Sequence, residues 1–431
     1  MNKFKYPYWL FLLFLFFLYG PLQIYTSRLQ LTIGVLVILG VLIYVVLIRK
    51  FYGATAHRWP IKNITWSTLL FLLYMIMSSG YGLYRGNSAW AIMGDVFPFF
   101  EFVAFAMVTL FVVREQKQIN SIAFVLLAAL TLKALWILYL FFTGQLLSMQ
   151  LAFSEHASMV EIGDIVSGRP FDPNITLITP CVLLYLTIFP KGISKWLLIF
   201  ILFFFLGFAV LSFTRSIWIG ITISIFLMIL LVSLYVDKKK GLKIIGFITL
   251  FSFVLAMAIN VISVEGESLY SLLTERIFHT VEQLDTKLGT LRIFEIQDAL
   301  DDFSRNFMFG KGMGGTLETL SREGVEAIDE QKTFIHNYPM ALLLKLGSVG
   351  MISLISVLFV LVKRSLLILK KSKGTNAYFF GISFLVFLTG FLIFINFQPI
   401  VVAYHTFALL GLIFSLMVIQ GNVPRRKDMY G

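Results

Sequence analysis

The only long polar interval in this apolar chain is residues 264–337, VEGESLYSLLTERIFHTVEQLDTKLGTLRIFEIQDALDDFSRNFMFGKGMGGTLETLSREGVEAIDEQKTFIHN. The interval holds 14 of the chain's 23 acidic residues. Apolar runs of about twenty residues, the length that a bilayer core requires, lie on both sides of it. The pattern therefore predicts a large loop outside the bilayer at residues 264–337, within a single integral membrane domain of residues 1–431.

The composition supports this class of protein. The chain has 431 residues, of which 58% are hydrophobic and 13% charged, and its mean hydropathy is +0.88. A soluble domain of this length could not bury so much apolar surface, so we expect an all-helical protein with many membrane spans. The net charge of +12 comes from short basic clusters between apolar runs, which indicates membrane topology rather than a nucleic-acid partner. The single cysteine, Cys181, excludes an intramolecular disulfide and a thiolate metal cluster.

The apolar runs predict about twelve spans. The first follows a basic start, as in a signal peptide, but no small-x-small cleavage site comes after it, so we interpret it as an uncleaved span. No internal repeat is seen, which gives no support to the repeated halves of many transporters. The expected spans are 8–24, 31–48, 64–84, 96–113, 119–142, 175–189, 196–214, 216–236, 243–263, 338–362, 377–397 and 400–420.

Charge placement predicts the orientation. With the first residue inside, 22 Lys and Arg residues fall on the cytoplasmic connections and tails. The short outer connections hold only Arg28, Arg85, Arg169 and Arg215. The positive-inside rule then places both chain ends in the cytoplasm and the long acidic loop outside.

The long loop is expected to fold against the membrane. Apolar residues recur at helical spacing over 269–284 and, less regularly, over 291–303, which predicts two amphipathic helices. The glycine-rich run 310–315 follows them. No strand precedes this run, so it does not fit a nucleotide-binding glycine motif. We expect a flexible turn, whose exposed amides could help to hold an anionic group.

Two arginines are candidates for anion binding. Arg215 lies between two spans and near the start of the second, where a helix N-terminus favours anions. The competing interpretation is an anchor that reaches the lipid headgroups. Arg292 begins the second loop helix, and its competing interpretation is a solvated pair with Glu295 three residues on.

A histidine and a turn complete the set of candidates. His336 directly precedes a span, where a neutral imidazole could act as a general base or could simply be satisfied by the backbone. Residues 169–174, Arg-Pro-Phe-Asp-Pro-Asn, end the second-longest outer connection and could equally be a Pro-Asn turn that starts a helix. A histidine and several arginines at the membrane edge suggest chemistry on a charged, lipid-borne substrate.

Four motifs occur in order along the chain: Phe171-Asp172-Pro173-Asn174, Thr214-Arg215-Ser216-Ile217-Trp218-Ile219-Gly220, Arg292 with Gly310-Lys311-Gly312-Met313-Gly314, and His336-Asn337 with Leu346-Gly347-Ser348-Val349-Gly350. In type, order and topology they resemble the O-antigen ligase and O-antigen polymerase superfamily. The resemblance covers about residues 165–350 and the twelve-span layout. The chain departs from the family at Ile217, where members usually have a small residue, and near Lys345, where they often have an acidic one.

The resemblance implies a bacterial cytoplasmic-membrane glycosyltransferase that resembles the GT-C type. Such an enzyme takes a glycan from an undecaprenyl diphosphate carrier on the outer leaflet and joins it to an acceptor glycan, without a cofactor or metal. By this resemblance Arg215 and Arg292 hold the diphosphate, and His336 takes the proton from the acceptor hydroxyl. Asn337, Asp172, Asn174 and Arg169 are expected to contact the substrate. A chain-length regulator is a further implied partner.

Several functions stay open at this point. A polymerase and an O-antigen ligase to a lipid A core use the same donor. The Phe-, Ile- and Lys-rich composition suggests an AT-rich bacterium without lipopolysaccharide, which favours the polymerase. A flippase for lipid-linked oligosaccharides would place charges along a path through the membrane, and only Lys133 lies clearly in the middle of a predicted span. A noncatalytic scaffold for envelope assembly would not need His336 or the two arginines.

Overall fold

The fold was determined as a computed structural model. It describes residues 5–21, 62–113, 115–146, 159–162, 165–168, 172–188, 194–212, 214–259, 263–264, 267–268, 287–317, 337–371, 377–397 and 405–421. Within a few helices some side chains lie outside the description, among them that of Arg292.

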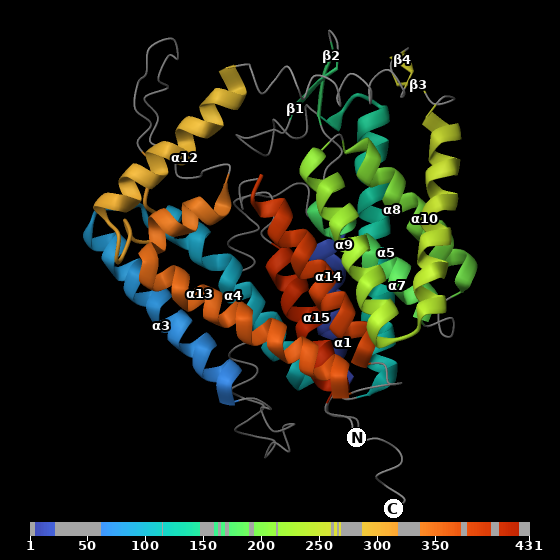
Figure 1. Cartoon of the computed structure of the whole chain (residues 1–431), viewed down its shortest axis with the longest axis horizontal. Coiled ribbons are helices and arrows are strands. Elements are labelled where there is room, and N and C mark those ends of the chain that lie inside the picture. Colours follow the sequence, from blue (N-terminus) through green and yellow to red (C-terminus); the bar gives the residue numbers. More distant parts are fainter. Residues whose placement is uncertain are drawn as a thin grey trace, which may run out of the picture.

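The described part of the chain is built from helices (Figure 1). Its only strands form two short antiparallel hairpins, which the sequence did not predict. In one hairpin, β1 (Met159–Ile162) pairs with β2 (Ile165–Gly168), and in the other, β3 (Ser263–Val264) pairs with β4 (Glu267–Ser268). The twelve described helices are α1 (Lys5–Tyr19), α3 (Lys62–Tyr84), α4 (Ala89–Val112), α5 (Gln116–Phe142), α7 (Pro173–Ile188), α8 (Lys195–Leu211), α9 (Arg215–Tyr235), α10 (Lys238–Ile259), α12 (Lys287–Arg305), α13 (Tyr338–Lys371), α14 (Ala377–Ile395) and α15 (Thr406–Gly421).

Six of the described helices are long and apolar enough to cross a membrane, namely α3, α4, α5, α9, α13 and α14. Helices α1, α7, α8 and α15 are also apolar but shorter. Together with α10, which covers most of the predicted span 243–263, these helices occupy eleven of the twelve predicted spans. The remaining one, at 31–48, lies outside the described residues. The second predicted loop helix is α12, whereas the first, at 269–284, also lies outside them.

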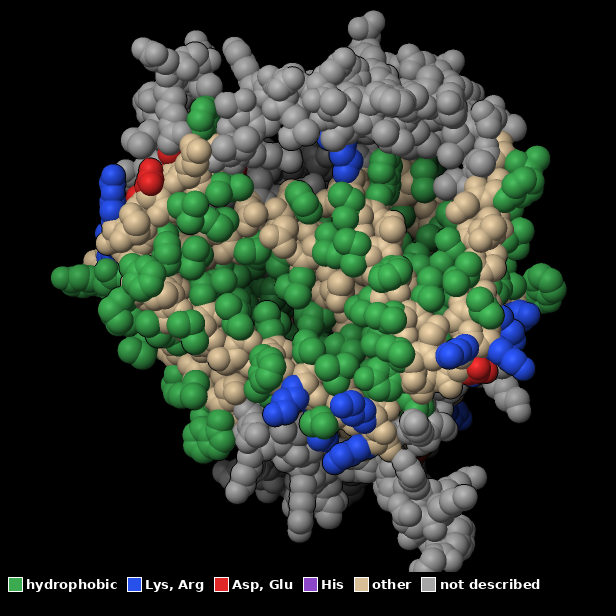
Figure 2. Space-filling model, in the orientation of Figure 1, with side chains coloured by type: hydrophobic (Ala, Val, Ile, Leu, Met, Phe, Trp, Pro, Cys, Tyr) green, Lys and Arg blue, Asp and Glu red, His purple; other side chains and the backbone are tan. Residues whose placement is uncertain are grey.

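Hydrophobic side chains cover much of the visible face (Figure 2). Exposed Leu, Ile and Phe side chains occur on most of the apolar helices. A soluble protein rarely exposes so much contiguous apolar surface, whereas a bilayer accepts it. The helix composition therefore identifies a multi-pass membrane protein.

The helices alternate in direction between two sides of the molecule. The starts of α1 and α5 and the end of α15 lie together, because the Tyr8 hydroxyl donates to the Gln118 carbonyl at 2.9 Å and Gln420 donates to Gln116 at 2.7 Å. Helix α12 and both hairpins lie on the opposite side (Figure 1), which we call the outer side. On the face drawn in Figure 2, Lys and Arg gather mainly near the other side, in agreement with the predicted orientation.

Helix α14 lies at the centre of the bundle and packs against α7, α9, α13 and α15. Small residues permit these close contacts. A Cβ on Gly220 of α9 would lie 3.2 Å from the carbonyl oxygen of Gly390 of α14, and Ser224 donates to the Val386 carbonyl at 3.0 Å. In a membrane, where lipid is as apolar as leucine, such small-residue packing and interhelical hydrogen bonds hold helices together.

Two buried ion pairs and one buried histidine–carboxylate hydrogen bond link helices inside the described bundle. Lys133 of α5 pairs with Asp172 before α7, Asp95 of α4 pairs with Lys345 of α13 at 2.6 Å, and Glu101 of α4 pairs with His405 before α15 at 2.8 Å. The expectation that only Lys133 lies clearly in the middle of a span is therefore wrong, because Glu101 lies near the middle of α4. Each of these polar side chains has a partner, as the low dielectric of a membrane interior requires.

The glycine-rich run is not the flexible turn that the sequence predicted. Gly310, Gly312 and Gly314 have φ of 68°, 81° and 75°, a conformation that favours glycine. The Asn87 amide, from the connection between α3 and α4, donates to the carbonyls of Lys311 and Met313 at 3.2 and 2.9 Å. The run is a packed connection between α12 and the helices beside it.

Candidate active site

Arg215 is the first residue of α9, at the outer side of the bundle, and its side chain is half-buried. The four amides that begin a helix have no partners inside the helix, and the helix dipole adds partial positive charge there. The arginine therefore lies where an anion is favoured twice, by the helix end and by its own guanidinium. This is the location that the sequence predicted.

Hydrogen bonds fix the turn that leads to Arg215. The Ser212 hydroxyl donates to the Ala209 carbonyl at 2.7 Å, and the Thr214 hydroxyl donates to the Ser212 carbonyl at 2.8 Å. The Trp218 indole donates back across the turn to the same Ala209 carbonyl at 2.9 Å. These hydrogen bonds hold the described backbone on both sides of Arg215.

Asp172 caps helix α7. One of its carboxylate oxygens accepts hydrogen bonds from the amides of Asn174 and Ile175 at 2.8 and 3.1 Å, and the other pairs with Lys133. These are the bonds expected of an aspartate at an N-cap. Both oxygens thus have protein partners, and Lys133, which was unexplained in the sequence, neutralises this carboxylate.

Asn174 differs from its neighbour. Its side chain is buried, and among the described residues its Oδ1 atom has no hydrogen-bond partner. A buried amide oxygen without a donor costs free energy, so a hydroxyl or amide donor at this point would be bound favourably. The expected contact between Asn174 and a substrate stays a prediction.

Asn337 caps helix α13 in the same way as Asp172 caps α7. Its side-chain oxygen accepts a hydrogen bond from the Met340 amide at 3.0 Å, and its carbonyl accepts one from the Ala341 amide at 3.0 Å. The side chain is only partly buried. Asn337 thus has a structural role that the sequence did not assign to it.

Helix α12 carries Arg292 and turns part of its acidic face inward. Glu295 and Asp298 are both 4% exposed. A solvated surface pair between Arg292 and Glu295 does not agree with this burial of Glu295. The next acid on this face, Asp302, forms an ion pair with Lys311 at 2.5 Å, which joins α12 to the glycine-rich run.

The amides of the glycine-rich run are already occupied. They donate to protein oxygens, so the expectation that they could hold an anionic ligand is wrong. The Lys311 amide donates to the Leu344 carbonyl, and the Gly312 amide donates to the Lys345 carbonyl. The Met313 amide donates to the Ser78 carbonyl, and the Gly314 amide donates to the carboxylate of Asp95.

The described candidates lie at the outer ends of three helices (Figure 1). Asp172, Asn174 and Arg215 are on α7 and α9, which pack against each other. Asn337 begins α13, on the other flank of α14. Arg169, His336 and the side chain of Arg292 lie outside the described residues.

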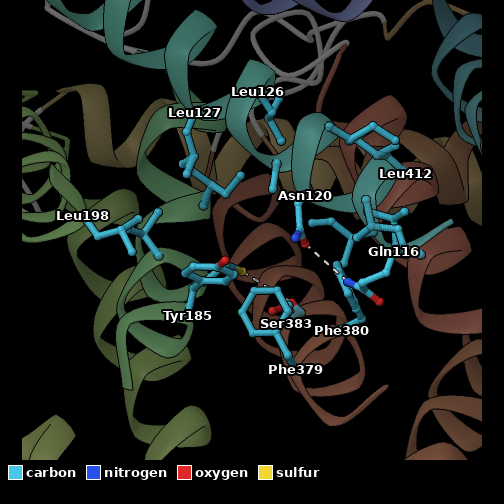
Figure 3. A pocket seen from close by; sticks show the side chains of 18 residues that line it. Gln116, Asn120, Leu126, Leu127, Tyr185, Leu198, Phe379, Phe380, Ser383 and Leu412 are labelled. Atoms are coloured by element: carbon cyan, nitrogen blue, oxygen red, sulfur yellow. Dashed lines mark hydrogen bonds between the residues drawn. The ribbon is translucent and has the colours of Figure 1, made fainter. Parts of the chain in front are cut away.

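An apolar cavity of about 170 Å³ lies elsewhere, among α5, α7, α14 and α15 (Figure 3). Tyr185, Phe379 and Ser383 line it, and Gln116 and Asn120 at the start of α5 lie at one end. This end belongs to the side opposite to Arg215. The cavity is therefore not part of the candidate site.

The sequence interpretation missed the carboxylates of α4. Asp95 and Glu101 are buried and hold α13 and the start of α15. The Tyr19 hydroxyl also donates to the His405 carbonyl at 2.9 Å. The signal was present, since an acid inside an apolar run requires a partner, but the partners are more than 240 residues away in the chain.

The comparison with protein families covers the part of the chain that carries these helices. A family model described as O-antigen ligase matches residues 200–355. Residues 200–355 form an O-antigen ligase domain. The resemblance that the motifs predicted is thus confirmed over these residues. A comparison with curated proteins finds no match to the chain.

The O-antigen ligase domain runs from within α8 to within α13 and includes Arg215, Arg292, His336 and Asn337. A domain of this family implies a glycosyltransferase-type enzyme of the inner membrane that acts on lipid-linked glycans. Asp172 and Asn174 precede the domain in sequence, but α7 packs against α9 within it. Among the described residues, no group of three His, Cys, Asp or Glu side chains is arranged to hold a metal ion.

Proposed function

We propose that this protein transfers glycan units from an undecaprenyl diphosphate carrier to an acceptor sugar hydroxyl on the outer face of the cytoplasmic membrane, as the polymerase of a surface polysaccharide. The observation that carries the proposal is the O-antigen ligase domain at residues 200–355, which includes both candidate arginines and the candidate base.

The position of Arg215 supports a role in holding the diphosphate. The donor has a charged head and a lipid tail, so its phosphates lie at the membrane surface. A guanidinium can bind two phosphate oxygens at once, which the ammonium of lysine cannot do in the same planar way. At the N-terminus of α9, Arg215 adds this geometry to a helix end that already favours anions.

The proposed reaction is a displacement at the anomeric carbon of the donor sugar. The acceptor hydroxyl oxygen forms the new bond to that carbon, and the bond from the carbon to the diphosphate oxygen breaks. The electron pair leaves with the lipid diphosphate, and His336 receives the hydroxyl proton. Arg215 and Arg292 stabilise the negative charge that develops on the leaving group. Asn174 contributes an acceptor for a sugar hydroxyl.

The transport alternative gains no support from the buried charges. A flippase would need charged groups available along a path through the membrane. Lys133 and Lys345 are instead each paired with a carboxylate of a neighbouring segment, and Glu101 is hydrogen-bonded to His405. Such pairs are expected of charges that hold helices in position.

The proposal is tested with purified protein in lipid vesicles and a lipid-diphosphate-linked oligosaccharide. We expect release of lipid diphosphate and products that contain several repeat units. Release with a single transfer to a lipid A core acceptor would favour the ligase alternative. Movement of the intact donor across the vesicle membrane without its cleavage would contradict the enzyme and favour the flippase.

A further inference from the structure

Helix α13 is interrupted near its outer end. Gly347 has φ of 64° and ψ of −172°, so residues 338–346 and the long span that follows are two helical segments joined at one glycine. A Cβ at this position would collide with the carbonyl oxygen of Met308, which explains why glycine is needed. The axis of the short first segment is therefore not fixed by the axis of the long span that follows.

The glycine-rich run, together with Phe307 and Met308 before it, fills the gap in the helix. At the break, backbone groups of α13 that would otherwise bond within the helix bond to the loop instead. The pairs are the Lys311 amide with the Leu344 carbonyl at 2.8 Å, the Gly312 amide with the Lys345 carbonyl at 3.1 Å, the Ser348 amide with the Phe307 carbonyl at 2.9 Å, and the Val349 amide with the Met308 carbonyl at 3.2 Å.

Asp95 joins both partners of this junction to a third helix. Its Oδ1 atom pairs with Lys345 Nζ at 2.6 Å, and its Oδ2 atom accepts the Gly314 amide at 2.7 Å. Asp95 is 8% exposed and Lys345 is 4% exposed. One carboxylate of α4 thus holds the first segment of α13 and the glycine-rich run at the same time.

We propose that Asp95 is a positioning residue for glycan transfer, which fixes the first segment of α13 and, through it, the histidine that directly precedes this helix. The proposal rests on the proposed function, in which His336 is the base. His336 is followed by Asn337, which caps the segment, so a rotation of residues 338–346 about Gly347 moves the point where the histidine is attached. Arg215 belongs to α9 and is not attached to this segment.

The test compares Asp95→Asn with wild-type protein in the vesicle assay. Asparagine keeps an acceptor for the Gly314 amide but loses the charge that holds Lys345. We expect kcat to fall by about 10- to 100-fold, because a shift of about 1 Å in a reacting group has effects of this size. The KM for the lipid-linked donor should stay within about twofold, because Arg215 on α9 is not attached to the first segment of α13 and the glycine-rich run after the helix of Arg292 keeps the acceptor for its Gly314 amide. Asp237→Asn, at an exposed helix cap on the cytoplasmic side, is the matched control and should leave both constants unchanged.

A second measurement follows the docking itself and needs no substrate. Met308→Cys and Val349→Cys place thiols at two exposed, hydrogen-bonded neighbours across the junction, while the native Cys181 is buried. With an added oxidant that accepts the two electrons of the thiol pair, we expect rapid disulfide formation between them in the otherwise wild-type chain and several-fold slower formation when Asp95→Asn is added. This readout stays valid if the wild-type protein releases no lipid diphosphate, which would count against the proposed function alone.

A double variant separates positioning from a general loss of folding. Asp95→Asn with Lys345→Met removes both charges of this buried pair, so we expect it to unfold at the wild-type temperature while kcat stays low and cross-linking stays slow. Wild-type kcat in the double variant would overturn the proposal. A fall in kcat for Asp95→Asn with unchanged cross-linking would also overturn it, because Asp95 would then act without moving α13.

Discussion

Arg215 combines two sources of attraction for an anion, its own guanidinium and the N-terminus of α9. The turn before it is held by side-chain hydrogen bonds from Ser212, Thr214 and Trp218. At the scale of single residues, the account therefore depends on the planar geometry of this group as well as on its charge.

We expect Arg215→Lys to lower the rate of lipid diphosphate release by about 10- to 100-fold, because lysine keeps the charge but loses the bidentate hydrogen bonds to phosphate. The rate is measured in vesicles at saturating acceptor. The unfolding temperature should not change. Activity near that of the wild type would mean that the fork geometry of Arg215 has no role.

Variants of Asn337 can distinguish a helix-capping role of this residue from a contact with the substrate. We expect Asn337→Ala to cost about 1 kcal/mol of stability, since it removes the acceptor for the Met340 amide. Asn337→Asp keeps a capping oxygen and should unfold at the wild-type temperature. Comparison of transfer rates then decides the role: full activity of Asn337→Asp indicates a cap alone, whereas loss of activity in a stable protein indicates a substrate contact through the amide.

Sequence reasoning predicted the position of Arg215 but not the helix-capping roles of Asp172 and Asn337. It located Arg215 at the start of a helix, because the gap between two apolar runs there is so short. It assigned Asp172 and Asn337 to the substrate, although both cap helices. Asp and Asn before a helix are the signature of a cap and also of a polar binding site, and only the hydrogen-bond partners distinguish the two.

At the scale of elements, the glycine-rich run acts as a connector. It ties α12 to α13, α4 and the connection between α3 and α4, and its glycines are needed for conformation and for space. A Cβ on Gly312 would lie 2.7 Å from the Cα of Gly82, and one on Gly310 would lie 2.5 Å from the Leu344 carbonyl oxygen.

We expect Gly312→Ala to destabilise the protein by at least about 1–2 kcal/mol, the cost of a left-handed conformation in an alanine, with the contact to Gly82 adding to it. The apparent unfolding temperature in detergent should fall by a few degrees. Gly246→Ala is the matched control, because Gly246 lies inside α10 with open space around it. The control should be neutral or slightly stabilising. Equal unfolding temperatures for the two variants would contradict the packed connection.

The apolar runs in the sequence predicted which helices form, but they predicted the ends of these helices less well. Helix α4 begins at Ala89, seven residues before the predicted span, and α13 continues through its basic residues to Lys371. Hydropathy marks the part of a helix that lies in lipid, whereas a helix can continue beyond the bilayer surface with charged side chains. The break at Gly347 was not predicted, because its cause is the loop that packs into it.

At the scale of the whole molecule, the placement of charge relates the bundle to the membrane. The starts of α1 and α5 and the end of α15 lie on one side, and α12 and the hairpins lie on the other (Figure 1). The count of basic residues in the sequence predicted this division. The ion pairs inside the bundle could not be predicted in the same way, because their partners are distant in sequence.

Cysteine labelling tests the orientation. We expect Ser304→Cys, exposed on α12, to react with a membrane-impermeant maleimide in intact spheroplasts, and Lys239→Cys to react only after permeabilisation. Both variants keep Cys181, which is buried and should remain unlabelled. The reverse pattern would place α12 in the cytoplasm and remove the outer-leaflet donor from the account.

The most direct test of the central claim is the release of lipid diphosphate from a lipid-diphosphate-linked oligosaccharide by purified protein in vesicles, measured for the wild type and for His336→Ala. The account predicts release by the wild type and no release above background by His336→Ala, with both proteins unfolding at the same temperature. No release by the wild type, or equal release by the two proteins, would contradict it.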